Sequence, residues 1–111
     1  MAPPSPLSIA TSSVSRLVKE EASYHKELLS QEARLKKLEE GTEEDENREF
    51  SLKQERAAIE ETKAVFPPLR ERIADAILKL EDQIKRSDND AEIKKAEEVV
   101  KEAKQAAAGN K

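Results

Sequence analysis

The chain has 111 residues, room for one small domain, and 40% of them are charged while only 3% are aromatic. This composition disfavours a sheet protein, which needs more aromatic and β-branched residues and more Gly turns than the two glycines present. The balance of 20 Lys and Arg against 24 Asp and Glu argues against nucleic acid as the main partner, because neutralising phosphates needs a basic surface. Helix-favouring residues such as Ala, Leu, Glu and Lys are abundant, so we expect an all-α protein.

The cellular setting follows from what the sequence lacks. It has no cysteine, which excludes disulfides and thiolate metal sites and suits a reducing compartment. Its Pro-rich start has neither the basic nor the apolar region of a secretory signal, and no stretch approaches the roughly 20 apolar residues of a membrane span. We therefore expect a cytoplasmic protein without membrane contact.

The first predicted helix covers about residues 13–40 and follows a segment, residues 1–12, that is expected to be flexible. Residues 11–13 (Thr-Ser-Ser) are candidate N-caps, and Gly41 can end the helix in a left-handed conformation. Its mainly apolar positions recur in alternating steps of three and four residues and so form one stripe along the helix, which we call the seam. A disordered chain has no reason to keep such a period. The seam consists of Val14, Leu17, Glu21, Tyr24, Leu28, Gln31, Leu35 and Leu38.

A second helix is predicted over about residues 48–86, after a connection formed by residues 42–47. The acidic run at residues 43–46 places negative charge at the N-terminus of this helix, where the helix dipole makes it favourable, and it should also aid solubility. The alternative role of this run is contact with a partner. The seam of this helix repeats every seven residues, and its intermediate positions are polar in the first half. The repeat consists of Leu52, Ile59, Phe66, Ile73 and Leu80, with Arg56, Lys63 and Arg70 and then Ile77 and Ile84 between them.

Pro67 and Pro68 interrupt the backbone hydrogen bonding in the middle of this second helix. They indicate either a break into two helices or one kinked helix. The sevenfold repeat passes through the Pro pair without a phase change, which favours the kink.

The third helix is predicted over about residues 91–108, with Asn89 and Glu92 spaced as a capping box and residues 109–111 as a tail. The three helices predict an antiparallel three-helix bundle, spectrin- or coiled-coil-like, as a single domain over residues 13–108. Since the third helix is short, it should cover one end of the other two and leave a two-helix hairpin at the far end. Its seam consists of Ile93, Ala96, Val100, Ala103 and Ala107.

No pattern in the sequence indicates catalysis. His25 is the single histidine, at the edge of the seam, with no Cys or second His to share a metal and no placed nucleophile. The glycines, at positions 41 and 109, are too far apart for a phosphate loop. We therefore predict no enzyme activity, no catalytic residues, no metal and no cofactor.

The order and spacing of several short motifs resemble the tubulin-folding cofactor A family over roughly residues 11–86. A Pro in mid-helix belongs to this likeness, although the present chain has two, and the third helix matches only in type and charge. The motifs are Val14 with Arg16-Leu17-Val18-Lys19-Glu20, Tyr24, Lys26-Glu27, Gln31-Glu32, Lys53-Gln54, Glu61-Thr62, and Pro67 or Pro68 with Arg70, Arg72 and Ile73.

This resemblance implies a three-helix bundle that captures β-tubulin released from the cytosolic chaperonin. It also implies that the protein passes β-tubulin on, together with other tubulin-folding cofactors, for assembly of the α/β heterodimer, which would place it in the cytoplasm with the cytoskeleton. Tyr24 lies in the seam and is expected to be buried. The partner-binding candidates flank the seam, and their alternative role is that of a solvated face: Arg16, Lys19, Glu20, Lys26 and Glu27.

The alternative function is a generic coiled-coil interaction or dimerisation module without tubulin specificity. The polar seam positions suit either a monomer or a homodimer of defined register, so both states stay open at this point. These positions are Glu21, Gln31, Arg56 and Lys63.

Overall fold

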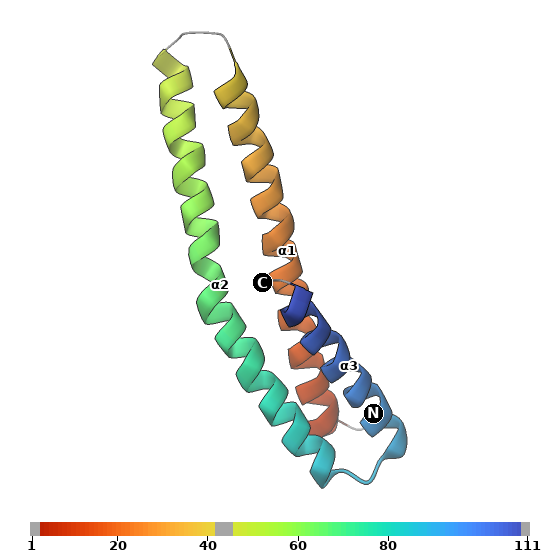
Figure 1. Cartoon of the computed structure of the whole chain (residues 1–111). Coiled ribbons are helices and arrows are strands. Elements are labelled where there is room, and N and C mark those ends of the chain that lie inside the picture. The colour runs from red at the N-terminus through yellow and green to blue at the C-terminus, as the bar shows by residue number, and fades with distance from the viewer. Residues whose placement is uncertain (1–2, 42–45, 110–111) are drawn as a thin grey trace. The chain divides into compact units, whose positions relative to one another are not determined.

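The computed structural model describes residues 3–41 and 46–109. Over these residues the chain forms three α-helices and no strand: α1 (Pro6–Glu40), α2 (Glu46–Arg86) and α3 (Asp90–Gly109) (Figure 1). The helices pack against one another, which confirms the all-α, three-helix class. In this described part of the chain, no helix is long and apolar enough to cross a membrane. Residues 43–45 of the predicted acidic run lie outside the described residues.

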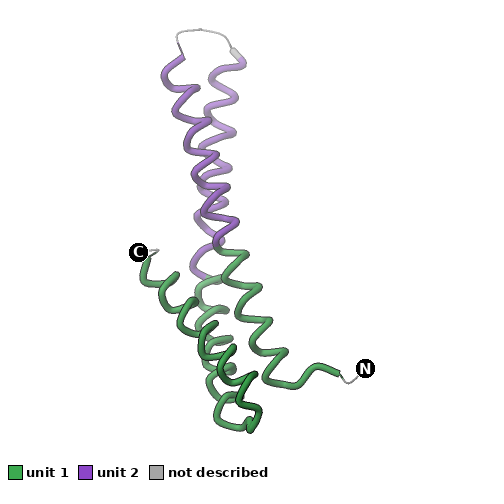
Figure 2. The backbone as a smooth tube through the Cα atoms, turned by 90° about the vertical axis from the view of Figure 1, so that its right-hand side faces the viewer, with its two compact units in different colours: residues 1–21, 68–111 green, residues 22–67 purple. Residues whose placement is uncertain are grey.

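The chain divides into two compact units (Figure 2). Unit 1 comprises residues 1–21 and 68–111 and contains parts of all three helices, whereas unit 2 comprises residues 22–67 and contains only α1 and α2. The expectation that the third helix covers only part of the other two, and leaves the rest of them as a two-helix hairpin, is therefore confirmed. A single domain over residues 13–108 stays a prediction.

The start of α1 differs from the sequence prediction. The helix begins at Pro6, so much of the segment expected to be flexible (residues 1–12) is helical. Ser5 is the N-cap, because its hydroxyl oxygen accepts a hydrogen bond from the Ser8 backbone N–H at 3.0 Å. Proline suits the first helical position, where no amide donor is needed, and the following Leu7 is buried. The pair Ser5-Pro6 is therefore the sequence signal that marks the N-terminus of this helix.

Residues 11–13, the predicted caps, consequently lie more than one turn inside α1. Thr11 is buried and its hydroxyl donates a hydrogen bond to the carbonyl oxygen of Leu7 at 2.8 Å. A hydroxyl that is hydrogen-bonded to the preceding turn is compatible with a helix interior. The cluster of Ser and Thr at residues 11–13 therefore does not mark the N-terminus of α1.

The other end of α1 lies at Glu40, as predicted, but for a different reason. The φ angle of Gly41 is not positive, so the expected left-handed cap is absent at this residue. Instead, the guanidinium of Arg48 on α2 donates from Nε to the carbonyl oxygen of Leu38 at 3.0 Å and from Nη2 to that of Glu39 at 3.1 Å. A side chain from the next helix thus satisfies the last carbonyl groups of α1.

The sevenfold seam of α2 is confirmed, but its intermediate positions in the first half are corrected. Thr62 and Leu69 are buried, whereas Lys63 and Arg70 are exposed. The same shift of one residue places Glu55, rather than the exposed Arg56, closer to the seam. From each member of the sevenfold repeat up to Ile73, the next seam residue therefore lies three positions on and the following one four positions further, the reverse of the predicted order. All members of the sevenfold repeat are buried: Leu52, Ile59, Phe66, Ile73 and Leu80.

The change in step has a packing reason. In unit 2, α2 packs on α1 alone, so a narrow stripe suffices. In unit 1 it packs on both α1 and α3, and two successive steps of four residues, from Leu69 to Ile73 to Ile77, widen the buried face. Ile77 lines a hollow together with Val18 of α1 and Ala103 of α3.

α2 continues through Pro67 and Pro68 without interruption, which excludes the break into two helices. Both prolines are exposed. The carbonyl groups that lose a donor belong to the exposed residues Lys63 and Ala64, where water can replace the missing hydrogen bonds. The kink itself stays a prediction.

α3 begins as predicted at its capping box. The Asn89 side-chain oxygen accepts a hydrogen bond from the Glu92 backbone N–H at 3.1 Å. The Glu92 carboxylate does not complete the reciprocal half of the box but accepts the Ser5 hydroxyl at 2.9 Å, which ties the starts of α1 and α3 together. Of the predicted seam, Ala96, Val100 and Ala103 are buried, Ile93 is half-buried and Ala107 is exposed.

The corrected seam predicts that a substitution at Leu69, which lies outside the sevenfold repeat, strongly lowers the stability of the protein. Leu69 is only 1% exposed, so Leu69→Ala should lower the free energy of unfolding by about 2–5 kcal/mol. Leu29 is 68% exposed, and Leu29→Ala, the matched control, should change it by less than about 0.5 kcal/mol. Urea denaturation measures both. Equal effects of the two substitutions would contradict the burial of Leu69 in the seam.

Candidate functional site

The five candidate contact residues all lie on α1 but not in one place. Arg16, Lys19 and Glu20 belong to unit 1, whereas Lys26 and Glu27 belong to unit 2. Four of them are exposed and Glu20 is half-buried. The first two, Arg16 and Lys19, line a common groove.

This groove lies between α1 and α3 in unit 1 and has a volume of about 320 Å³. Every charged side chain that lines it is basic, although the whole chain has a net charge of −4. None of the three basic residues forms an ion pair within the described part of the chain. We call it the cationic groove; its lining residues are Thr11, Ser12, Ser15, Arg16, Lys19, Lys95 and Val99.

The local sequence explains why these side chains meet. Thr11, Ser12 and Ser15 are small residues of α1 that leave space beside α3. Arg16 and Lys19 follow on the next turn, since residues three or four apart are neighbours on a helix surface. Lys95, an exposed residue of α3, is the third basic residue of the groove. The sequence alone does not show that it lies near Arg16 and Lys19. The groove offers hydroxyl groups and positive charge, which suit an acidic segment of a partner.

Glu20 does not line the cationic groove. Its carboxylate lies 4.0 Å from Nη2 of Arg72 on α2, so it extends toward a different neighbouring helix. The sequence placed Glu20 next to Lys19, but successive residues on a helix point about 100° apart and need not share a surface.

An ion pair between buried Glu21 and the more exposed Arg70 joins α1 and α2 in unit 1. The carboxylate of Glu21, with its side chain 5% exposed, accepts a hydrogen bond from Nε of Arg70 at 3.0 Å. The Arg70 side chain is 48% exposed and reaches the carboxylate from the edge of the seam. The pair explains how an acidic residue occupies a seam position, and it has a structural role.

Ring contacts fill the same interface in unit 2. His25 stacks on Phe66 with ring centroids 4.4 Å apart, and Tyr24 meets Phe66 edge-on at 6.4 Å. Both α1 residues are half-buried, which confirms His25 at the edge of the seam. Among the described residues, no group of three or more His, Cys, Asp and Glu side chains is placed to hold a metal ion.

The fold and the groove define the class of helical bundle proteins with a charged surface groove. The family model described as tubulin binding cofactor A matches residues 2–107. The chain therefore belongs to the tubulin binding cofactor A family, which consists of non-enzymatic tubulin chaperones. The match confirms both the resemblance seen in the sequence and the prediction that the protein is not an enzyme, and it extends into α3. Comparisons with curated proteins and with solved structures find no match.

The Glu21–Arg70 pair should be measurable as a coupling energy. In a double-mutant cycle of Glu21→Ala and Arg70→Ala, we expect a favourable coupling of about 0.5–3 kcal/mol in the free energy of unfolding. The exposed pair Lys36–Glu40, at 4.0 Å on α1, is the control and should give at most about 0.5 kcal/mol. Because the Glu21 carboxylate is buried, its coupling should also persist at high salt. Equal couplings in the two cycles would contradict a distinct role for the Glu21–Arg70 pair.

Proposed function

We propose that this protein captures β-tubulin released from the cytosolic chaperonin and keeps it competent for assembly. It then passes β-tubulin on, together with other tubulin-folding cofactors, for assembly of the α/β-tubulin heterodimer. Family membership supports a tubulin-binding role, and the likeness of the first and second helices to the family supports the choice of β-tubulin. The proposed setting is the cytoplasm, in association with the cytoskeleton.

The observation that carries the proposal is the cationic groove of unit 1. Its charged groups stand on two helices rather than on loops, and they lack ion-pair partners within the described residues. Complementary charge speeds association and selects the partner without requiring a large apolar surface that would hold the client permanently. Arg16, Lys19 and Lys95 therefore form the proposed contact with an acidic surface of β-tubulin.

The remaining candidates contribute differently in this proposal. Glu20 lies 4.0 Å from Arg72, with both side chains partly exposed, and stays a proposed contact outside the cationic groove. Lys26 and Glu27 are exposed on α1 in unit 2 and stay proposed contacts of their own.

Selectivity for β-tubulin is the first test. The purified full chain, immobilised and exposed to isolated β-tubulin and α-tubulin in parallel, should retain β-tubulin and leave α-tubulin in the flow-through. Retention of neither subunit, or of both equally, would reject the proposed function and favour a generic interaction module.

The second test addresses the cationic groove. Combining Arg16→Glu and Lys95→Glu should lower the affinity for β-tubulin by roughly tenfold or more, because like charges then oppose the client. Lys101→Glu combined with Lys94→Glu is the matched control, since both lysines are exposed on α3 and do not line the groove. Unchanged helical content by circular dichroism shows that the variants fold. An equal loss in the control pair would mean that net charge, not the groove, determines binding. Lys26→Glu, measured alongside, tests the contact proposed for unit 2.

A further inference from the structure

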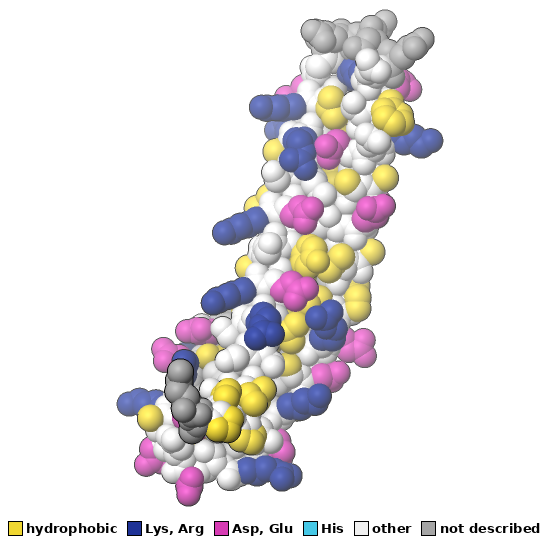
Figure 3. All heavy atoms as spheres, turned by 180° about the vertical axis from the view of Figure 1, so that it is seen from behind, with side chains coloured by type: hydrophobic (Ala, Val, Ile, Leu, Met, Phe, Trp, Pro, Cys, Tyr) yellow, Lys and Arg dark blue, Asp and Glu magenta, His cyan; other side chains and the backbone are white. Residues whose placement is uncertain are grey.

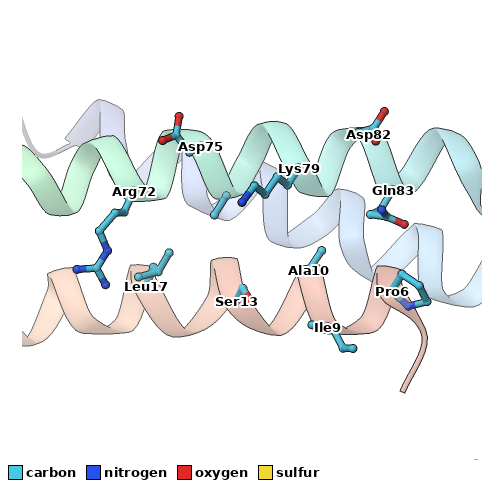
Figure 4. Close-up of a pocket in the computed structure, with 11 residues that line it drawn as sticks. Pro6, Ile9, Ala10, Ser13, Leu17, Arg72, Asp75, Lys79, Asp82 and Gln83 are labelled. Carbon is cyan, nitrogen blue, oxygen red and sulfur yellow. The ribbon is translucent and has the colours of Figure 1, made fainter. Parts of the chain in front are cut away.

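A larger groove lies between α1 and α2 in unit 1, with a volume of about 660 Å³ (Figure 4). The α1 side contributes mainly apolar residues, and among them Ile9 is 54% exposed. On the face seen in Figure 3, apolar side chains in the lower part of unit 1 gather between basic and acidic ones. We call this the α1–α2 groove; the argument below uses its residues Ile9, Ala10, Leu17, Arg72, Ala76 and Lys79.

The α1–α2 groove lies on the side of the α1–α2 pair opposite α3. Where α3 packs, Nζ of Lys104 on α3 lies 3.2 Å from the carboxylate of Glu81 on α2. Residues two positions apart on a helix point about 200° apart, so Glu81 and the groove residue Lys79 leave α2 in nearly opposite directions. Figure 4 likewise shows α3 passing behind the two helices that form the groove. Two helices in contact have a groove on either side, and in unit 1 α3 fills one of them.

The dimensions of the α1–α2 groove suit a helix as its occupant. Its lining residues run from residue 6 to residue 17 on α1 and from residue 72 to residue 83 on α2, so the groove follows each helix for about 16 Å, or about three turns. Its apolar α1 residues include Ile9, Ala10 and Leu17, which are seven or eight positions apart and therefore lie along one side of α1. A helix with an apolar stripe can pack along such a floor, as α3 does on the other side.

The charged side chains that extend over the groove are basic. Arg72 and Lys79 are seven residues apart and therefore lie almost in line along α2. Figure 4 shows both extending toward α1, whereas Asp75 and Asp82 point away from it. Arg72 lies 4.0 Å from Glu20, and Lys79 forms no ion pair within the described residues. An occupant therefore meets an apolar floor along α1 and a basic edge along α2.

The α3 side shows how a charged edge of α2 is matched by a neighbouring helix. There α2 presents the acidic Glu81, and α3 supplies the basic Lys104. On the side of the α1–α2 groove the sign is reversed, so a helix that packs there needs acidic residues at its edge. Arg72 and Lys79 are about 10.5 Å apart along α2, and the acidic residues of an occupant aligned with α2 should therefore also be seven positions apart.

We propose that the α1–α2 groove binds an amphipathic helix of a partner protein, with an apolar stripe and two acidic residues seven positions apart at its edge. The stripe packs on Ile9, Leu17 and Ala76, and the acidic residues pair with Arg72 and Lys79. The partner thereby adds a fourth helix to unit 1. The proposal does not rest on the capture of β-tubulin, because it assigns a second surface, separate from the cationic groove, whose partner is apolar as well as acidic.

The probe for this surface is a synthetic amphipathic peptide of about 18 residues, long enough to form a helix along the whole groove. It carries a stripe of leucines with two glutamates, seven positions apart, at one edge of the stripe. A second peptide has lysine in place of these two glutamates. Fluorescence anisotropy of each labelled peptide, titrated with the full chain at low salt, measures the two dissociation constants. We expect saturable binding of the acidic peptide, at least about tenfold tighter than that of the basic one.

Charge reversal in the chain should reverse this preference. When Arg72→Glu and Lys79→Glu are combined, the basic peptide should bind more tightly than the acidic one, a result that misfolding of the variant cannot produce. Lys94→Glu combined with Lys101→Glu is the matched control. These exposed lysines of α3 are also seven positions apart and do not line the groove, and their reversal changes the net charge equally. The control variant should keep the preference for the acidic peptide.

Several outcomes would overturn the proposal. They are the absence of saturable binding of the acidic peptide to the unmodified chain, equal affinities for the two peptides, and a preference that the Arg72 and Lys79 reversals leave unchanged. Ile9→Asp, which places a charge in the apolar floor, should weaken binding of the acidic peptide by roughly tenfold or more. If sedimentation equilibrium without peptide shows a dimer that Ile9→Asp dissociates, a second copy fills the groove and the proposal is wrong. The probe is a peptide alone, so none of these outcomes depends on β-tubulin binding.

Discussion

α1 and α2 are charged helices, and each has only a narrow apolar stripe with which to pack on the other. In both units this stripe sets which side chains are buried and which remain on the surface. Because a helix buries one face in a two-helix contact, a residue one position away from the stripe is already exposed, as Lys63 is in unit 2. The charged surface available for a partner is thus a direct consequence of how little the helices bury.

Polar groups at the edge of the stripe are held by partners across the interface. Arg70 reaches Glu21 in unit 1, and Arg34 reaches Glu55 at 3.2 Å in unit 2. Such pairs allow a polar residue to occupy a seam position without leaving a buried charge alone. They also restrict the register of α1 against α2, since each pair joins specific positions of the two helices.

The third helix changes the surface as well as the core. Its buried residues include two alanines, Ala96 and Ala103, which let α3 lie close to the other helices of unit 1. Where α3 lies beside α1, the cationic groove forms, and a second groove of about 660 Å³ lies between α1 and α2. One unit therefore presents two grooves of different chemistry.

The sequence by itself determined the helical class, the sevenfold seam of α2 and the Asn89 cap, because these depend on residues close together in one helix. Tertiary structure alone decided what depends on a neighbouring helix. Leu69, like Thr62 seven residues before it, is buried in place of the neighbouring position that the sequence pattern favoured. The last turn of α1 is capped by Arg48 of the next helix and not by a left-handed glycine. Likewise, Arg16, Lys19 and Lys95 share a groove only because α3 lies beside α1, a placement that no pattern within a single helix contains.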